Sequence, residues 1–179
     1  MARNIEIKAR VSDLGKLEAR VREIADRGPF ELRQDDTFFA THSGRLKLRA
    51  FEEGNGELIF YRREDAAGPR LSEYSVVPTS RPRELRLLLE QALGITGRVR
   101  KRRRVYLAGN TRVHLDQVEG LGCFLELEVV LSDSQSIAEG EAVARGLMSR
   151  LGVTEASLID GAYIDLLRKS EAPSPQPNG

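Results

Sequence analysis

Alternation between apolar and charged residues, repeated in several short segments, constrains this chain more than any other feature of its sequence. The first example is NIEIKARV, residues 4–11, in which Ile5 and Ile7 alternate with Glu6 and Lys8. Because successive side chains of a strand point to opposite faces, each such segment predicts a β-strand with one apolar and one charged face. Turn residues such as Gly54-Asn55-Gly56 separate the segments and favour antiparallel connections between them.

The predicted strands are numerous enough to close on themselves. We expect them at residues 3–11, 31–41, 44–51, 57–63, 70–77, 99–107, 111–118 and 123–131. An antiparallel sheet of this size has to protect its edges, and closure into a barrel protects them most completely. The predicted fold is therefore α+β, a closed eight-stranded antiparallel β-barrel with helices packed outside.

Apolar residues at helical spacing predict the helices. One begins with Ser12 as its N-cap and ends at Gly28-Pro29, and a second has Ser80 as its cap and Pro82 in its first turn. A third is expected at residues 135–151, and a short last one contains Tyr163. The apolar face of the second helix is expected to consist of Leu85, Leu88, Leu89 and Ala92.

The charged faces of the strands are segregated by sign. Side chains at i and i+2 lie roughly 7 Å apart, so like charges repel unless something of opposite sign lies between them. We therefore expect these faces inside the barrel, and the apolar faces outside, beneath the helices. Strand by strand, the charged faces carry Glu6 and Lys8; Arg45, Lys47 and Arg49; Lys101 and Arg103; Arg112, His114 and Asp116; and Glu126 and Glu128.

Such an interior is typical of a site for a polyanion and a metal. The strands that carry cations outnumber those that carry carboxylates, which favours an anionic ligand larger than the carboxylates could neutralise. Carboxylates beside a phosphate group most plausibly hold a hard divalent cation, and Mg²⁺ is commonly bound by one or two carboxylates together with phosphate oxygens. Glu126 and Glu128 are the expected metal end of the tunnel.

These segments together resemble a known family. IEIK near the start, DTFF before GRLKLR, LIFYRRED, GPRLSEY, KRRRVYL, HLDQVEGLGCFLELEVVL and GAYIDLL resemble the CYTH family over residues 3–168. That family groups class IV adenylyl cyclases with thiamine and inorganic triphosphatases, within the triphosphate tunnel metalloenzymes. The resemblance implies an eight-stranded tunnel and Mg²⁺- or Mn²⁺-dependent chemistry on a triphosphate.

The resemblance also implies roles for individual residues. The ExExK signature falls on Asn4, Glu6 and Lys8; Asn4 keeps an oxygen ligand but removes a negative charge, which leaves the number of metals open. Arg62 shares its face with Leu58 and Phe60, so its assignment requires a bulge or another register. The implied catalytic residues are Glu6, Lys8, Lys101 and Arg103; the triphosphate-binding residues are Lys8, Arg45, Lys47, Arg49, Arg62, Lys101, Arg103 and Arg112; and the metal ligands are Glu6, Asp116, Glu126 and Glu128.

The sequence leaves the reaction open. A class IV adenylyl cyclase-like enzyme would convert ATP to cyclic AMP and pyrophosphate, whereas an inorganic or thiamine-type triphosphatase would hydrolyse the terminal phosphate. A non-enzymatic alternative is a polyanion- or RNA-binding module built around RKRRR at residues 100–104. His114 more often has a structural role than a role in such a tunnel.

Composition limits the setting. The chain has 179 residues and a formal net charge of +1, so it is expected to be one domain at residues 1–169 with a disordered tail at 170–179 and no bulk attraction to nucleic acid. A single cysteine, Cys123, and the lack of a long apolar run favour the cytoplasm, with no membrane partner. The expected partner is a small triphosphate, and a homodimer is left open.

Overall fold

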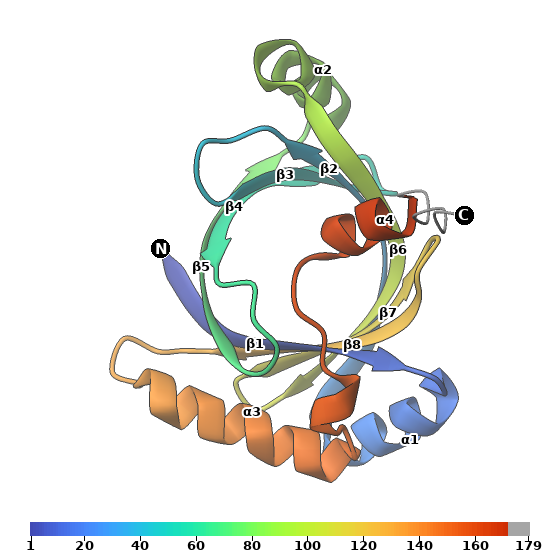
Figure 1. Ribbon diagram of the computed structural model, residues 1–179, viewed down its shortest axis with the longest axis vertical. Helices are drawn as coiled ribbons and strands as arrows, with labels where there is room; N and C mark the ends of the chain where they lie inside the picture. Colours follow the sequence, from blue (N-terminus) through green and yellow to red (C-terminus); the bar gives the residue numbers. More distant parts are fainter. Residues whose placement is uncertain (172–179) are drawn as a thin grey trace, which may run out of the picture.

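A computed structural model describes residues 1–171 and shows a closed antiparallel barrel with four helices outside it (Figure 1), which confirms the predicted α+β architecture. Around the barrel the strands follow the order β1-β5-β4-β3-β2-β6-β7-β8. Their bounds are β1 (Ala2–Val11), β2 (Arg27–Phe39), β3 (Arg45–Phe51), β4 (Gly56–Arg63), β5 (Arg70–Thr79), β6 (Ile95–Ala108), β7 (Thr111–Val118) and β8 (Gly122–Val130).

Strand β1 closes the barrel. On one side Ile5 pairs with Leu71 of β5, and on the other side it pairs with Val129 of β8, both in antiparallel register. Each of the other strands in residues 1–171 likewise has two neighbours, so none of the described strands presents a free edge.

The main apolar core lies outside the barrel wall. Helices α1 (Leu14–Ile24) and α3 (Ile137–Leu151) contact each other on one side of the barrel (Figure 1), where α3 packs against β1 and β8 and α1 packs against β6 and β7. Beneath them Ile7, Leu127 and Val21 of α1 are fully buried, and Leu147 of α3 is buried beside them. Each such side chain contributes about 1.5–3 kcal/mol when it leaves water. This arrangement confirms that the apolar faces of these strands point outward, beneath helices.

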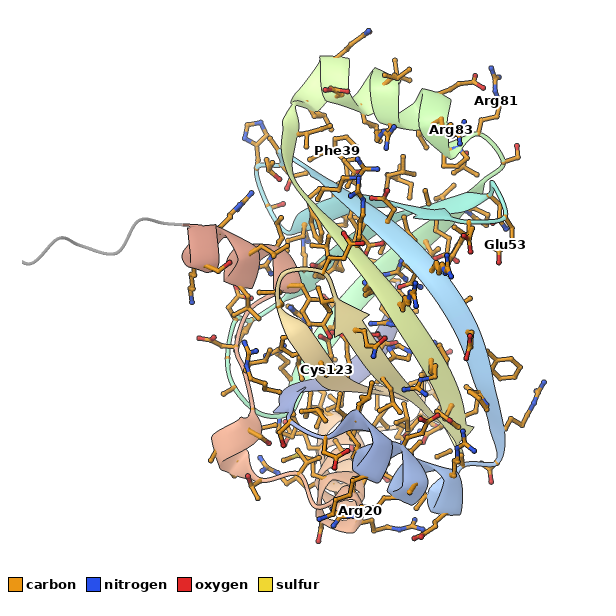
Figure 2. The ribbon with its side chains drawn as sticks, turned by 90° about the vertical axis from the view of Figure 1, so that its right-hand side faces the viewer. Arg20, Phe39, Glu53, Arg81, Arg83 and Cys123 are labelled. Atoms are coloured by element: carbon orange, nitrogen blue, oxygen red, sulfur yellow. The ribbon has the colours of Figure 1, made fainter. Side chains whose placement is uncertain are left out.

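Helix α2 (Pro82–Leu93) contrasts with α1 and α3. Among the described residues of this helix only Pro82 is buried, and Leu88 is 61% exposed. Figure 2 shows the helix, with Arg81 and Arg83 at its start, at the end of the molecule opposite to α1. The predicted helix is therefore present, but Leu88 of its apolar face stays exposed, because this helix extends beyond the barrel wall instead of lying along it.

Two boundaries differ from the prediction for local reasons. Asp13, not Ser12, caps α1, because its side chain accepts a hydrogen bond from the Lys16 amide at 2.9 Å. Gly28-Pro29 does not end the helix but lies within β2, at an irregularity where the pairing with β6 shifts between Arg27 and Phe30. A bulge of this kind accommodates a proline, which has no N–H for the sheet.

Helix α4 (Tyr163–Glu171) lies across one opening of the barrel in Figure 1. A second apolar cluster joins Ala162, Tyr163 and Ile164 to Ile59 and Val99 on the inner face of the barrel. Of the expected tail, residues 170 and 171 belong to α4, and 172–179 lie outside the described residues. None of the helices in residues 1–171 combines the length and apolar composition that crossing a membrane requires.

Candidate functional site

The charged faces of the strands enclose a cavity of about 380 Å³ inside the barrel. The interior is therefore charged, as predicted from the alternation. Seven basic side chains line the cavity, namely Lys8, Lys47, Arg49, Arg63, Lys101, Arg103 and Arg112. Five acidic side chains join them, namely Glu6, Asp36, Glu57, Glu126 and Glu128.

One side of the cavity is organised around a single carboxylate. Asp36 of β2 accepts hydrogen bonds from Lys47 Nζ at 3.1 Å, Arg49 Nε at 2.8 Å and Lys101 Nζ at 3.0 Å. These four residues are called the basic wall below. Burial alone would raise the pKa of Asp36, but Arg49, Lys101 and Lys47 hold it well below its usual value. Three cations around one anion leave this wall with surplus positive charge.

Burial weakens the charge of one member of the basic wall. The pKa of Lys47 falls to about 7, mainly because removal from water penalises the ammonium form and only partly because Asp36 opposes this effect. Arg49 and Lys101 add repulsion. An anionic ligand beside Lys47 would offset this penalty.

The opposite side of the cavity carries three carboxylates. Across β1 and β8, Glu6 pairs with Glu128 and Lys8 pairs with Glu126. These four residues are called the acidic wall below. Lys8 Nζ lies 3.7 Å from Glu6 Oε1 and 3.4 Å from Glu126 Oε1, so one ammonium group contacts two carboxylates.

Two arginines each hold one further oxygen of the acidic wall. Arg103 Nη2 donates to Glu126 Oε2 at 2.6 Å, and Arg112 Nε donates to Glu128 Oε2 at 2.7 Å. Burial opposes ionisation of Glu126, but Lys8 and then Arg103 keep its pKa well below the usual value. In Glu6 burial dominates and raises the pKa, although Arg63 acts in the other direction. The two carboxyl groups therefore differ in how readily they take up a proton.

Donor atoms of the acidic wall, together with the neighbouring His114, fit a divalent cation. One donor atom each from His114, Glu126 and Glu128 lies within 4.8 Å of the others. Carboxylate oxygens are the ligands that Mg²⁺ and Mn²⁺ take in proteins. The side-chain oxygen of Asn4, which also lines the cavity, is buried and has no hydrogen-bond partner within residues 1–171. The residues present could therefore hold such an ion.

Buried arginines near Glu6 retain unused donors. Arg63 forms an ion pair with Glu6 and donates to the Gly161 carbonyl at 2.7 Å. Its Nε, like the Nε of the buried Arg70, has no hydrogen-bond partner in the described part of the chain. A buried donor without a partner costs free energy that an anionic ligand would recover.

Most of the predicted site residues lie where the alternation puts them. Those that line the cavity are Glu6, Lys8, Lys47, Arg49, Lys101, Arg103, Arg112, Glu126 and Glu128. Their proximity follows from the barrel, whereas their individual roles in catalysis, substrate binding and metal binding stay predictions.

Arg62 does not lie in the cavity, and its predicted position there is wrong. Its side chain is exposed and approaches Ser43 Oγ at 3.4 Å, whereas the neighbouring Arg63 points inward. The register is regular through this strand, with Tyr61 paired to Tyr74 and Arg62 to Glu73. Without a bulge, Arg62 keeps the outward parity of Phe60.

Two further residues lie beside the cavity and not on its surface. Asp116 is fully buried, and its oxygens accept hydrogen bonds from Arg103 at 2.7 and 2.6 Å and from the Tyr163 hydroxyl at 2.9 Å. In this structure it positions Arg103 instead of facing the cavity as a metal ligand would. Arg45, at the end of β3, pairs with Asp65 at 2.7 Å and Asp165 at 2.9 Å and does not line the cavity within the described residues.

Sequence reasoning missed Asp36, Arg63 and Glu57. Asp36 had a signal, because Lys47 and Arg49 on one face require an anion between them, and Asp36 lies in the strand before theirs. Alternation did separate the two faces of RKRRR correctly. Lys101 and Arg103 point inward, whereas Arg100 and Arg104 lie outside, where they pair with Asp35 and Glu18. Partial neutralisation of this outer face disfavours a nucleic-acid patch.

Comparison with known proteins agrees with this geometry. The CYTH domain family model matches residues 2–163. A protein of Methanocaldococcus jannaschii named as a putative adenylate cyclase is 23% identical over 172 residues, which cover 90% of this chain and 97% of the relative.

Solved structures share the fold. The PH1012 protein of Pyrococcus horikoshii OT3 superposes with a TM-score of 0.82 at 24% identity, over 92% of this chain and 99% of that one. A Hippeastrum protein, described as a putative adenylyl cyclase with a dominant triphosphatase activity, gives a TM-score of 0.68 at 14% identity, over 97% and 98% of the two chains. At these identities the structures establish the architecture alone. With the family model matched over nearly the whole barrel, the chain belongs to the CYTH domain family.

Proposed function

We propose that this protein is a divalent-metal-dependent enzyme that acts on a triphosphate, with ATP cyclisation to cyclic AMP and pyrophosphate as its reaction. The observation that carries the proposal is the juxtaposition in one cavity of the basic wall, which has surplus positive charge, and the acidic wall, whose oxygens can hold a cation. Phosphate groups bridged to a metal need both kinds of surroundings at once.

The basic side chains would bind the triphosphate. Lys47, Arg49 and Lys101 would exchange part of their contact with Asp36 for phosphate oxygens, and Arg63 has an unused Nε to contribute. Arginine can contact two phosphate oxygens at once, which orients the chain of phosphates as well as neutralising it. Lys8 and Arg103, held by carboxylates of the acidic wall, lie at the boundary between the anion and the metal.

Glu126 and Glu128, with Glu6 nearby, would hold Mg²⁺ or Mn²⁺. When bound, such an ion neutralises charge on the phosphoryl group and the leaving group. Glu6 is suited to another task, because burial raises the pKa of this carboxyl above its usual value and so favours the uptake of a proton. We assign it the proton released when a hydroxyl attacks phosphorus.

Two reactions are compatible with these walls. In the cyclase, the ribose 3′-hydroxyl attacks the α-phosphorus, its proton passes to Glu6, and pyrophosphate leaves. In a triphosphatase, water attacks the terminal phosphorus instead. Apolar side chains that could contact a nucleobase also line the cavity and support the cyclase, namely Leu32, Phe51, Val76 and Val105. The activity described for the Hippeastrum protein supports the hydrolase as the second candidate.

The test is a product analysis. The purified protein is incubated with ATP, inorganic triphosphate and thiamine triphosphate, each with Mg²⁺ or Mn²⁺, and cyclic AMP, pyrophosphate and phosphate are measured together. Equimolar cyclic AMP and pyrophosphate from ATP support the cyclase, whereas phosphate alone supports the hydrolase. Salt-dependent RNA binding without turnover of any triphosphate would overturn the enzymatic proposal in favour of a binding module.

A further inference from the structure

His114 lies against the two glutamates of the acidic wall. It is on β7, is 4% exposed, and pairs directly with Glu126 of β8. Its Nδ1 lies 3.9 Å from Glu128 Oε1, which is the oxygen of that carboxylate not bonded to Arg112. The imidazole is therefore a neighbour of the atoms that would hold a metal.

The imidazole has no other task that the structure reveals. Its Nδ1 is buried and has no hydrogen-bond partner among residues 1–171. A neutral imidazole carries a lone pair on one ring nitrogen and is a common metal ligand. A structural histidine would ordinarily use both nitrogens in hydrogen bonds.

Two neutral residues beside the acidic wall, Asn4 and His114, affect which cation this site would prefer. Asn4 stands on the same face as Glu6 and supplies a neutral oxygen, and His114 supplies a neutral nitrogen. Mg²⁺ prefers oxygen ligands and depends strongly on their negative charge, whereas imidazole suits first-row transition metals. A set with fewer charges and one nitrogen therefore shifts preference away from Mg²⁺.

We propose that His114 is a nitrogen ligand to the metal, beside Glu126 and Glu128, and that it makes the site selective for Mn²⁺ over Mg²⁺. This inference rests on the metal dependence proposed above, but it concerns the identity of the ion and of one ligand.

The first test uses the wild-type protein with Mn²⁺ alone. Pulsed electron paramagnetic resonance of bound Mn²⁺ is expected to show ¹⁴N coupling from a directly bound imidazole. The chain has two histidines, and the other, His42, is exposed in a turn, so His42→Gln is the matched control and should leave the coupling unchanged. Bound Mn²⁺ without nitrogen coupling would overturn the inference and leave the proposed function intact.

The second test uses His114→Gln, which keeps a polar side chain of similar length. Dissociation constants for Mn²⁺ and Mg²⁺ are measured by titration, after a thermal melt has verified that the variant folds. We expect Mn²⁺ affinity to fall about tenfold, equivalent to one imidazole contact of about 1.4 kcal/mol, and Mg²⁺ affinity to change less than about twofold. Equal losses for the two ions would refute the selectivity. If neither ion binds to the wild-type protein, both the metal-dependent function and the inference about His114 are refuted.

Discussion

The basic wall and the acidic wall bury charge in opposite ways. In the basic wall one carboxylate, Asp36, gathers three cations and uses both oxygens to do so. In the acidic wall each glutamate has cations nearby, yet Glu128 keeps an oxygen facing His114. The basic wall thus carries surplus positive charge, whereas the acidic wall keeps carboxylate oxygens without a hydrogen-bond donor among the described residues. The comparison teaches that a single cavity can carry surplus positive charge on one side and uncommitted carboxylate oxygens on the other.

Removing the carboxylates of the acidic wall is expected to have the largest effect. The double change Glu126→Gln and Glu128→Gln keeps shape but removes two charges, so the turnover number should fall by about 10³-fold or more. Circular dichroism and a thermal melt check that the fold survives. The exposed Glu119→Gln is the matched control, and unchanged turnover of the double variant would exclude these residues from the metal site.

Among these variants, neutralising Asp36, the carboxylate that the three cations of the basic wall share, should lower the free energy of unfolding most. Asp36→Asn leaves Lys47, Arg49 and Lys101 buried beside one another, so the free energy of unfolding should fall by about 3–5 kcal/mol. The neighbouring Asp35→Asn is the control: Asp35 points outward, pairs with Arg98, and should cost less than about 1 kcal/mol.

Added ligand sharpens the same comparison. Because inorganic triphosphate would supply the missing negative charge, it should stabilise Asp36→Asn more than it stabilises the wild type. Urea denaturation with and without triphosphate measures both quantities. Similar losses of unfolding free energy in the Asp36 and Asp35 variants would contradict the role of Asp36 as the shared partner of the three cations.

Arg62 and Arg63 are neighbours in β4 but lie on opposite faces, with Arg63 inside the barrel and Arg62 outside. Arg63→Gln removes a charged donor from the cavity, so KM for the triphosphate should rise about 10–100-fold, the equivalent of roughly 1.5–3 kcal/mol. Arg62→Gln should change KM less than about twofold. Steady-state kinetics below the melting temperature of both variants decide the matter, and the reverse order would mean that the register of β4 is shifted.

The smallest effect is a proton taken up with the ligand. The pKa of Lys47 is about 7 in the free protein, and a bound polyanion raises it, so above pH 7 the complex holds more protons than the free protein. The affinity should therefore increase as the pH falls through 7 and become independent of Lys47 below about pH 6. Calorimetry in buffers of different ionisation enthalpy should give uptake of about half a proton at pH 7 and nearly one at pH 8.

Lys47→Arg isolates this contribution from the protons of the triphosphate itself, because an arginine stays charged throughout the range. The difference in proton uptake between the two proteins should vanish below about pH 6. Identical uptake by both proteins at pH 8 would show that Lys47 is already charged in the free cavity.

Much of this architecture could be predicted, because a period of two residues fixes the face on which each side chain lies. Glu6, Lys8, Glu126 and Glu128 followed from parity alone once closure was assumed. Arg62 failed because a family position was followed against the parity of its own strand, and parity was right.

The parity of a residue in its strand does not tell how far its side chain reaches into the cavity or which residues it pairs with. Arg45 and Lys47 share a face, yet only Lys47 reaches the cavity, because Arg45 lies at the strand end, where Asp65 and Asp165 hold it. Asp116 has the inward parity of His114 but lies behind Arg103 and Tyr163. Such differences depend on the tilt of the strands and on a helix about 50 residues later in the chain, which no local pattern encodes.

The pairing of β1 with both β5 and β8 has a consequence for how the protein is made. A ribosome releases the segment with Glu6 and Lys8 first, but the partners of these residues on β8 come more than a hundred residues later. During synthesis the chain therefore cannot form the acidic wall until β8 is available, and a product truncated before β8 would lack that wall. Because the first strand pairs with the eighth, the wall of the cavity can close only after β8 has been synthesised.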